Sequence, residues 1–235
     1  MKVSIIIRAF NNEKTLERAI KSSLGQNYPE EDFEVVVVND GSTDKTLEII
    51  KKFASVKNLR IVNQENQGHA QAANTGILSS QGDYIVFLDG DDEFDPDLLS
   101  QEAEVLDSSS SVDFVYCDYI EEYKGNKKTV SPKNIFESVM IGVMMRRKRV
   151  LDEGLYNPNI TFIEYDLFLR TLGKWNGQHI NKSLFTYHRD TQSITAKQSK
   201  VIAGIKELEE LHPNKLIEIS QIRSYLLPKS HGKSY

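Results

Sequence analysis

Short runs of β-branched and apolar residues alternate with helical patterns along the first part of this chain. An uninterrupted run such as residues 34–38 is typical of a strand buried on both faces. Between the runs, residues that cap helices precede apolar residues at helical spacing. The alternation predicts an α/β fold with a mostly parallel, Rossmann-like central sheet flanked by helices. The predicted strands span residues 3–7, 34–38, 60–62 and 84–88, and the helices between them begin near Asn11, Ser42 and Gly68.

The later part of the chain has a weaker strand pattern and ends in helices. The sequence predicts a helix from residues 95–97, a strand over 114–119, a polar turn near Gly125, an apolar run over 139–145, and helices over 146–154 and 164–173. After about Thr195 the apolar spacing is wholly helical. Since no long linker or repeat interrupts the chain, we expect one domain over residues 1–195 and a helical C-terminal tail over residues 196–235.

The overall charge and the lone cysteine limit the kind of protein this can be. The formal net charge is −5, which argues against a nucleic-acid partner, because such proteins present a basic face. Cys117 is the only cysteine, which fits a reducing compartment. No apolar run approaches the roughly 20 residues of a membrane span, and no secretory leader is evident. We expect a cytoplasmic protein, while Lys229 and Lys233 leave open a peripheral contact with the inner face of a membrane.

Polar residues follow each of the four predicted strands at its carboxyl end, where open parallel sheets bind ligands. The three carboxylates of the stretch FLDGDDEF repel one another unless a cation neutralises them. Oxygen ligands without cysteine favour a hard ion such as Mg²⁺ or Mn²⁺, which proteins hold with one or two carboxylates plus substrate phosphates. These residues therefore predict a substrate that contains a diphosphate group. The residues at this edge are Asn11, Asp40, Asn66, Gln67, Gly68, Asp89, Asp91 and Asp92.

Each of these groups also has a plain structural interpretation. An acidic turn or a helix cap explains any one of them without a ligand. Structural Ca²⁺ binding is a further alternative, but the spacing does not match an EF-hand loop. Their convergence on one edge of one sheet favours a ligand site.

Five stretches of the chain carry a family resemblance. They read VSIIIRAFNNEKTLERAIKSSLGQ, EVVVVNDGSTDKT, NQGHAQAANTGI, GDYIVFLDGDDEFDPDLL and EYDLFLRTL. In order and spacing they resemble the inverting glycosyltransferases of family 2, which have the GT-A fold. The resemblance covers residues 1–195, most strongly residues 1–100. It implies a nucleotide-sugar donor, with a UDP-sugar favoured, a divalent metal (Mn²⁺ or Mg²⁺) and direct displacement at the anomeric carbon.

The resemblance also implies roles for single residues. Asp40 would contact the uracil or guanine base, and the first Asp of the Asp-x-Asp element, Asp89, would face the ribose or the sugar. Asp91 would ligate the metal, Asp92 would share either task, and His188 is either a metal-site histidine or a surface residue. The other positions implied to contact the nucleotide-sugar are Ala9, Phe10, Asn11, Glu13, Asn66, Gly68, Asn74 and Gly90.

Inversion needs a general base that takes the proton of the acceptor hydroxyl. The stretch FIEYDLFLR aligns Glu164 with the family's base, and Asp166 is the fallback. A carboxylate near a helix start is stabilised in its ionised form, as a base requires. The alternative is an acidic first turn without a chemical role.

Three positions depart from the family pattern. Arg8 replaces the usual proline after the first strand, and it is either a cation near the nucleotide or a solvent-facing side chain. Ala73 replaces an arginine, for which His69 or Arg8 could substitute. The family's late histidine falls at Asp190.

The leading hypothesis is transfer of the sugar to a hydroxyl of a glycan or lipid-linked acceptor. A catalytically degenerate nucleotide-sugar-binding scaffold is the rival. A sugar-1-phosphate nucleotidyltransferase is disfavoured, because RAFNNEKTL lacks a glycine-rich loop. The helical tail could shape an acceptor cleft, form a homodimer contact or lie on a membrane, and ordinary packing is preferred.

Overall fold

The computed structural model describes residues 1–189 and 194–227. Its sheet has the strand order β3-β2-β1-β4-β8-β6-β9-β5, with β7 paired to β6. The strands are β1 Val3–Ala9, β2 Phe33–Asp40, β3 Leu59–Gln64, β4 Tyr84–Asp89, β5 Glu93–Phe94, β6 Phe114–Tyr123, β7 Asn126–Val130, β8 Met144–Arg146 and β9 Gly177–His188. The helices are α1 Leu16–Leu24, α2 Thr46–Lys51, α3 His69–Ser79, α4 Leu98–Ser108, α5 Arg147–Asp152, α6 Ile163–Thr171, α7 Gln198–Leu211 and α8 Leu216–Leu226.

The first four strands form the parallel half of the sheet, as predicted. β1 lies between β2 and β4, and β3 pairs with β2, all parallel. Alternate residues of β1 face opposite sides: Val3, Ile5 and Ile7 pack in the cluster that includes α1, α2 and α4, whereas Ile6 packs with α3. Because both faces are covered, the strands read as continuous apolar runs. The predicted α/β class, with helices flanking the sheet, is confirmed.

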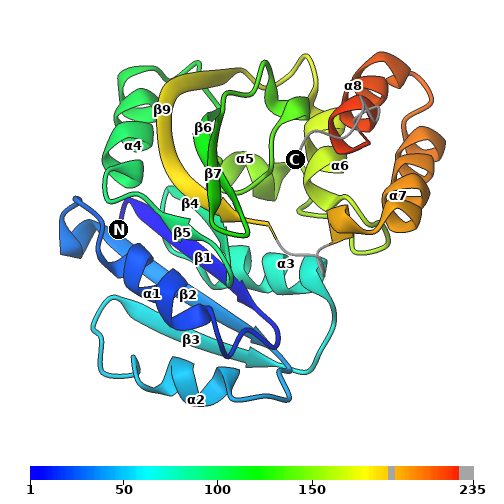
Figure 1. Cartoon of the computed structure of the whole chain (residues 1–235). Helices are drawn as coiled ribbons and strands as arrows, with labels where there is room; N and C mark the ends of the chain where they lie inside the picture. Colours follow the sequence, from blue (N-terminus) through cyan, green and yellow to red (C-terminus); the bar gives the residue numbers. More distant parts are fainter. Residues whose placement is uncertain (190–193, 228–235) are drawn as a thin grey trace.

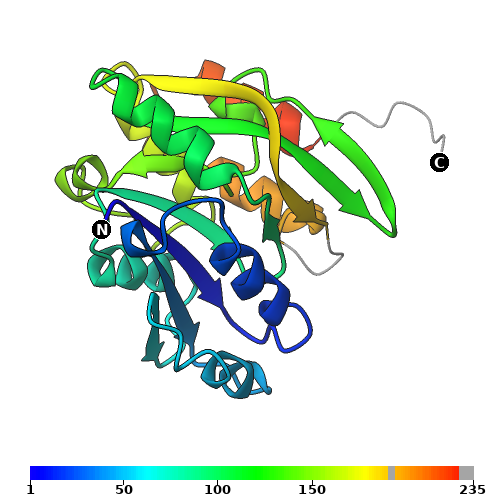
Figure 2. The same cartoon turned by 90° about the vertical axis from the view of Figure 1, so that its left-hand side faces the viewer.

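The second half of the sheet is mixed and was only partly predicted. β8 is antiparallel to both β4 and β6, and β6 runs parallel to β9. Figure 2 shows the long strands β6 and β9 side by side. The predicted polar turn near Gly125 is the connection from β6 to β7. The apolar run 139–145 contributes only the short β8, and neither β5 nor β9 was predicted.

The helices α7 and α8 pack onto the body of the protein. Val201, Ile205 and Ile222 are buried in one cluster with Ile163 of α6, and Figure 1 shows α6, α7 and α8 gathered at one end of the molecule. Burying these apolar side chains holds the helical segment against α6. The division of the chain at residue 195 stays a prediction. Within residues 1–189 and 194–227, no helix has the length and apolar character that a membrane crossing requires.

Candidate active site

The carboxyl ends of β1, β2 and β4 open into one pocket of about 510 Å³. Parallel strands bring their ends to a common edge, so residues far apart in sequence meet there. The pocket also takes side chains from α6, β9 and α8. Most of the predicted site residues line it: Ala9, Phe10, Asp40, Asn66, Gly68, Asp89, Gly90, Asp91, Asp92, Glu164 and His188.

Asp40 organises the loop that leads into α3. Its Oδ1 accepts hydrogen bonds from the Gln64 side chain at 2.7 Å and from the Gln67 N–H at 2.9 Å, and its Oδ2 accepts from the Gly68 N–H at 2.9 Å. Gly68 adopts a φ of 86°, which glycine permits without a steric penalty. The buried Asp40 thus holds the loop in place and borders the pocket.

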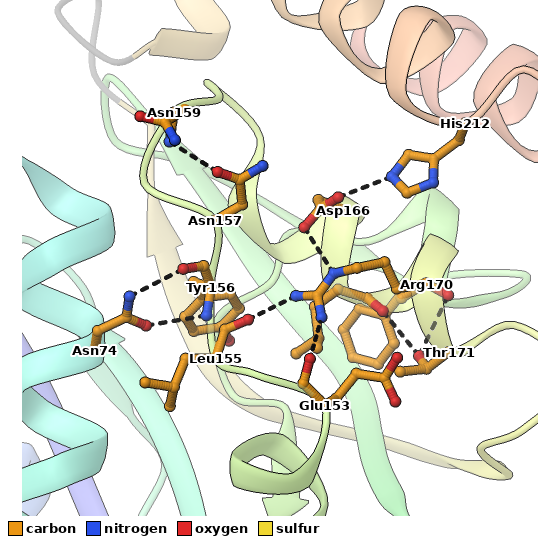
Figure 3. A network of polar contacts seen from close by, with 12 residues as sticks. Asn74, Glu153, Leu155, Tyr156, Asn157, Asn159, Asp166, Arg170, Thr171 and His212 are labelled. Atoms are coloured by element: carbon orange, nitrogen blue, oxygen red, sulfur yellow. Dashed lines mark hydrogen bonds and ion pairs between the residues drawn. The ribbon is translucent and has the colours of Figure 1, made fainter.

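Three predicted nucleotide contacts hold neighbouring loops and are not among the pocket-lining residues. The Asn11 Oδ1 accepts from the Thr43 N–H at 2.9 Å, and the Glu13 Oε2 accepts from the Lys45 N–H at 3.1 Å. Asn74 exchanges two hydrogen bonds with the backbone of Tyr156, at 2.9 and 3.0 Å (Figure 3). Their direct contact with a nucleoside stays a prediction, and their described contacts are structural.

Arg8 joins two of the carboxylates. Its Nε and Nη2 donate to the Asp89 Oδ1 at 3.0 and 2.6 Å, and its Nη1 donates to the Glu164 Oε1 at 2.7 Å. The guanidinium also lies over the Phe87 ring, 5.4 Å from its centroid. Burial works against the charged form, but Asp89 and Glu164 outweigh it and raise the pKa of Arg8. Of the two interpretations of Arg8, the structure supports a cation inside the site.

Asp92 and His188 form a second polar group at the pocket. The Oδ1 of the buried Asp92 accepts a hydrogen bond from the backbone N–H of His188 at 2.6 Å. Its Oδ2 is buried without a hydrogen-bond partner among the described residues. Burial, with Asp91 and Asp89 nearby, raises the pKa of Asp92 well above its usual value. Burial has the opposite effect on the His188 imidazole and lowers its pKa, because the charged form of histidine is the protonated one. The imidazole lies 3.6 Å from Glu93 and 3.8 Å from Glu122.

These groups fit a divalent cation that a substrate helps to hold. Within the described residues, no three His, Cys, Asp or Glu side chains are already arranged as a complete metal site. Asp89, Asp91 and Asp92 nevertheless border one pocket, and the buried, unpartnered Oδ2 of Asp92 is an oxygen ligand of the type that Mg²⁺ and Mn²⁺ prefer. Phosphate oxygens would complete the coordination.

The two candidate bases have different surroundings. Glu164 lies in the first turn of α6 and lines the pocket. Asp166 does not line it: its Oδ2 accepts from Arg170 at 2.9 Å and its Oδ1 lies 2.8 Å from the His212 ring (Figure 3). Asp166 is only 2% exposed, so both of its oxygens serve a buried network. Of the two carboxylates of α6, Glu164 is therefore the one that borders the pocket.

The remaining lining is largely apolar and aromatic, and sequence reasoning missed it. Apart from Phe162 and Tyr165, which lie in the stretch FIEYDLFLR, these side chains come from separated segments that no motif marks. Tyr187 is the next-to-last residue of the unpredicted β9, and Tyr225 lies in the tail. The pocket-lining residues that were not predicted include Met140, Ile141, Thr161, Phe162, Tyr165, Tyr187, Thr195, Tyr225 and Leu226.

Comparison with known families decides the relationship. The profile described as glycosyl transferase family 2 matches residues 4–170. The chain belongs to this family. The predicted family, whose members are glycosyltransferases, is confirmed.

Curated relatives of the family 2 chain are mostly longer proteins. An uncharacterized glycosyltransferase of Haemophilus influenzae is 34% identical over 204 residues, which cover 82% of this chain and 78% of that protein. The poly(ribitol-phosphate) β-N-acetylglucosaminyltransferase TarS of Staphylococcus aureus is 29% identical over 64% of this chain and 26% of its own length. The putative glycosyltransferase EpsH of Bacillus subtilis is 31% identical over 54% of this chain and 36% of its own length. The match thus spans about a third or less of these last two relatives.

Solved structures confirm the GT-A-like fold. Residues 1–349 of S. aureus TarS superimpose with a TM-score of 0.76 at 20% identity, covering 99% of this chain and 74% of that one. TarS in complex with UDP-GlcNAc gives 0.74 at 19% identity, over 96% and 72%. The mannosyltransferase PcManGT of Pyrobaculum calidifontis, in complex with GDP-Man and Mn²⁺, gives 0.74 at 16% identity, over 97% and 70%.

Proposed function

We propose that this protein transfers a sugar, with inversion, from a nucleotide-diphospho-sugar to a hydroxyl of a glycan or lipid-linked acceptor, with Mn²⁺ or Mg²⁺. A UDP-sugar is the favoured donor. The observation that carries the proposal is that Asp89, Asp91 and Asp92 share one pocket with Glu164, which comes from a distant helix. Structures of the fold with UDP-GlcNAc and with GDP-Man and Mn²⁺ support the donor class.

The positions of the carboxylates support this reaction. Glu164 takes the proton of the acceptor hydroxyl while the oxygen of that hydroxyl bonds to the anomeric carbon. The bond between the anomeric carbon and the diphosphate oxygen breaks in the same step. Asp89, Asp91 and Asp92 would hold the divalent cation, which neutralises charge on the departing diphosphate. Arg8 contacts Glu164 at 2.7 Å and orients its carboxylate. Direct displacement needs no covalent sugar intermediate on the protein.

A nucleotide-sugar-binding scaffold without turnover is the second candidate. One observation favours it: Arg8 engages both Asp89 and Glu164, so each carboxylate already has a partner. A scaffold would bind a nucleoside diphosphate yet neither hydrolyse nor transfer the sugar.

Thermal unfolding with UDP, GDP or ADP, with and without Mn²⁺, tests the proposal. A ligand that binds only the native state stabilises it, by about 2.7 kcal/mol at a hundredfold excess over its dissociation constant. We expect a metal-dependent rise of the unfolding midpoint with UDP. The Asp91→Ala variant should lose the metal dependence.

Release of UDP from a UDP-sugar then separates enzyme from scaffold. Glu164→Gln should keep the UDP-induced shift and lose turnover. No stabilisation by any of the three nucleotides would contradict the proposal, whereas stabilisation without sugar release by the wild type would favour the scaffold.

A further inference from the structure

The pocket contains an aromatic wall that the donor-binding residues do not explain. We use this name for Met140, Phe162, Tyr165, Tyr187, Tyr225 and Leu226, all of which line the pocket. Phe162 and Tyr165 flank Glu164 in sequence, so the wall begins beside the proposed base. The last two members lie at the end of α8. A nucleoside diphosphate and its metal account for the acidic part of the pocket and leave this part unassigned.

The wall combines apolar ring surface with polar tips. The Tyr165 hydroxyl donates to the Ser138 carbonyl at 2.9 Å, so its polar end is satisfied inside the protein. The ring of Tyr165 therefore adds apolar surface to the wall. Met140, Phe162 and Leu226 extend this surface.

Tyr225 brings a hydroxyl to the wall. Its oxygen lies 2.8 Å from the hydroxyl of Tyr119, which is only 1% exposed. A hydrogen bond between two hydroxyls uses the proton of one of them, so the proton of the other is not used in this contact. When the buried Tyr119 donates, the proton of Tyr225 remains available to a molecule in the pocket. Burial raises the pKa of Tyr225 to about 12, so the hydroxyl keeps this proton at neutral pH.

The segment that carries Tyr225 is anchored to the helix that carries Glu164. The His212 ring, between α7 and α8, lies 2.8 Å from Asp166 of α6 (Figure 3). Ile219 and Ile222 of α8 are buried in the same cluster as Tyr165. The spacing between the wall and Glu164 is thereby fixed by packing.

We infer that the aromatic wall is the acceptor subsite, that it binds a carbohydrate ring by stacking, and that the Tyr225 hydroxyl donates a hydrogen bond to that ring. The inference rests on the proposed function. A sugar ring has an apolar C–H face and a hydroxylated edge, which matches aromatic bodies with polar tips. A lipid chain would be matched by a uniformly aliphatic channel, whereas this wall contains three tyrosines. The acceptor atom that reacts is then a sugar hydroxyl beside Glu164.

Acceptor kinetics of the full chain test this assignment. The probes are methyl glycosides of hexoses and N-acetylhexosamines, compared with long-chain alcohols, with the nucleotide-sugar that the wild type hydrolyses as donor. Tyr225→Phe removes the hydrogen bond to the acceptor together with the contact to the Tyr119 hydroxyl. It should raise the KM for the methyl glycoside about tenfold with little change in kcat. Tyr225→Ala also removes the aromatic ring and should raise the KM for the methyl glycoside about thirtyfold.

Tyr123→Phe and Tyr123→Ala are the matched controls, because Tyr123 ends β6 and does not line the pocket. Neither control should change the acceptor KM. An unchanged acceptor KM in both Tyr225 variants overturns the inference, as does transfer to long-chain alcohols alone or donor turnover with no methyl glycoside accepted. In each of these outcomes the wild type still turns over the donor, so the proposed function survives. A wild type without donor turnover refutes both.

Discussion

Arg8 occupies a position between the donor side of the pocket and the proposed base. Its guanidinium bonds to Asp89 and to Glu164, and its side chain is 11% exposed. Charge-assisted hydrogen bonds of this kind orient a carboxylate as well as stabilise it. Glu164 should therefore lose its fixed position when the guanidinium is removed.

Arg8→Gln should lower the transfer rate about tenfold or more while changing UDP affinity less than threefold. A tenfold loss corresponds to about 1.4 kcal/mol of transition-state stabilisation. Steady-state kinetics and a UDP titration measure the two effects. Arg149→Gln is the control: it removes another Arg–Asp pair, with Asp113 at 2.7 Å, that is not among the pocket-lining residues, so it should cost stability alone. Wild-type transfer by Arg8→Gln would show that Arg8 is only structural.

Glu102 is a fully buried carboxyl group on α4, away from the pocket. Neither of its oxygens has a hydrogen bond of normal geometry among the described residues, and burial outweighs the effect of the nearby Cys117 thiol and Met144 backbone. Burial raises its pKa well above the usual value of 4.5. The native state therefore keeps a proton that the unfolded chain releases above that pH. It follows that stability falls as pH rises from about 4.5 toward the native pKa, by up to about 1.4 kcal/mol per pH unit.

Glu102→Gln removes this titration. The midpoint of thermal unfolding of the variant, relative to the wild type, should be higher at pH 8 than at pH 5. Unfolding scans at the two pH values measure the difference. Glu104→Gln, at an exposed position of the same helix, should leave the pH dependence unchanged. A constant offset between Glu102→Gln and the wild type at both pH values would contradict the prediction.

At the scale of elements, the network around Asp166 holds several segments together. Arg170 bonds to Asp166 and also donates to the Glu153 and Leu155 carbonyls at 2.7 and 2.6 Å (Figure 3). The His212 contact adds the connection between α7 and α8. One carboxylate thus links α6 to the loop after α5 and to the C-terminal helices.

Asp166→Asn should lower the free energy of unfolding by roughly 2–5 kcal/mol, because removing one partner leaves a part-buried guanidinium without its counter-charge. Denaturant unfolding measures the loss. Asp152→Asn is the control, since its ion pair with Lys148 is exposed and should contribute less than about 1 kcal/mol. The variant should still bind UDP at low temperature. If UDP binding is lost while stability is kept, Asp166 acts in the site after all.

For the whole molecule, the sequence indicated the parallel half and its polar edge. Strands covered on both faces leave a continuous apolar signal, and carboxylates crowded after a strand are conspicuous without any structure. β9 left no such signal, since its first residues are largely exposed or half-buried and its buried residues come near its end. The two-residue β5 is too short for periodicity.

The residues of the pocket were likewise only partly predictable from the sequence. Asp40 and Asp89 could be placed from strand ends alone, whereas Tyr187 and Tyr225 meet only through tertiary packing. The local pattern also could not separate Glu164 from Asp166, two residues apart on one helix. Their burial and partners differ, and only Glu164 of the two lines the pocket, while the choice of base stays a prediction. Asp190, Lys229 and Lys233 lie outside the described residues, so the predictions that involve them stay predictions.

Arg8 and Asp89 are also register partners on the adjacent strands β1 and β4. The backbone ladder that pairs these strands sets the distance between the two side chains before any substrate arrives. The conformational entropy of bringing this cation and this carboxylate together is therefore lost during folding and not during binding. A donor that enters the pocket meets charges already in position, and more of its binding energy remains for the chemical step.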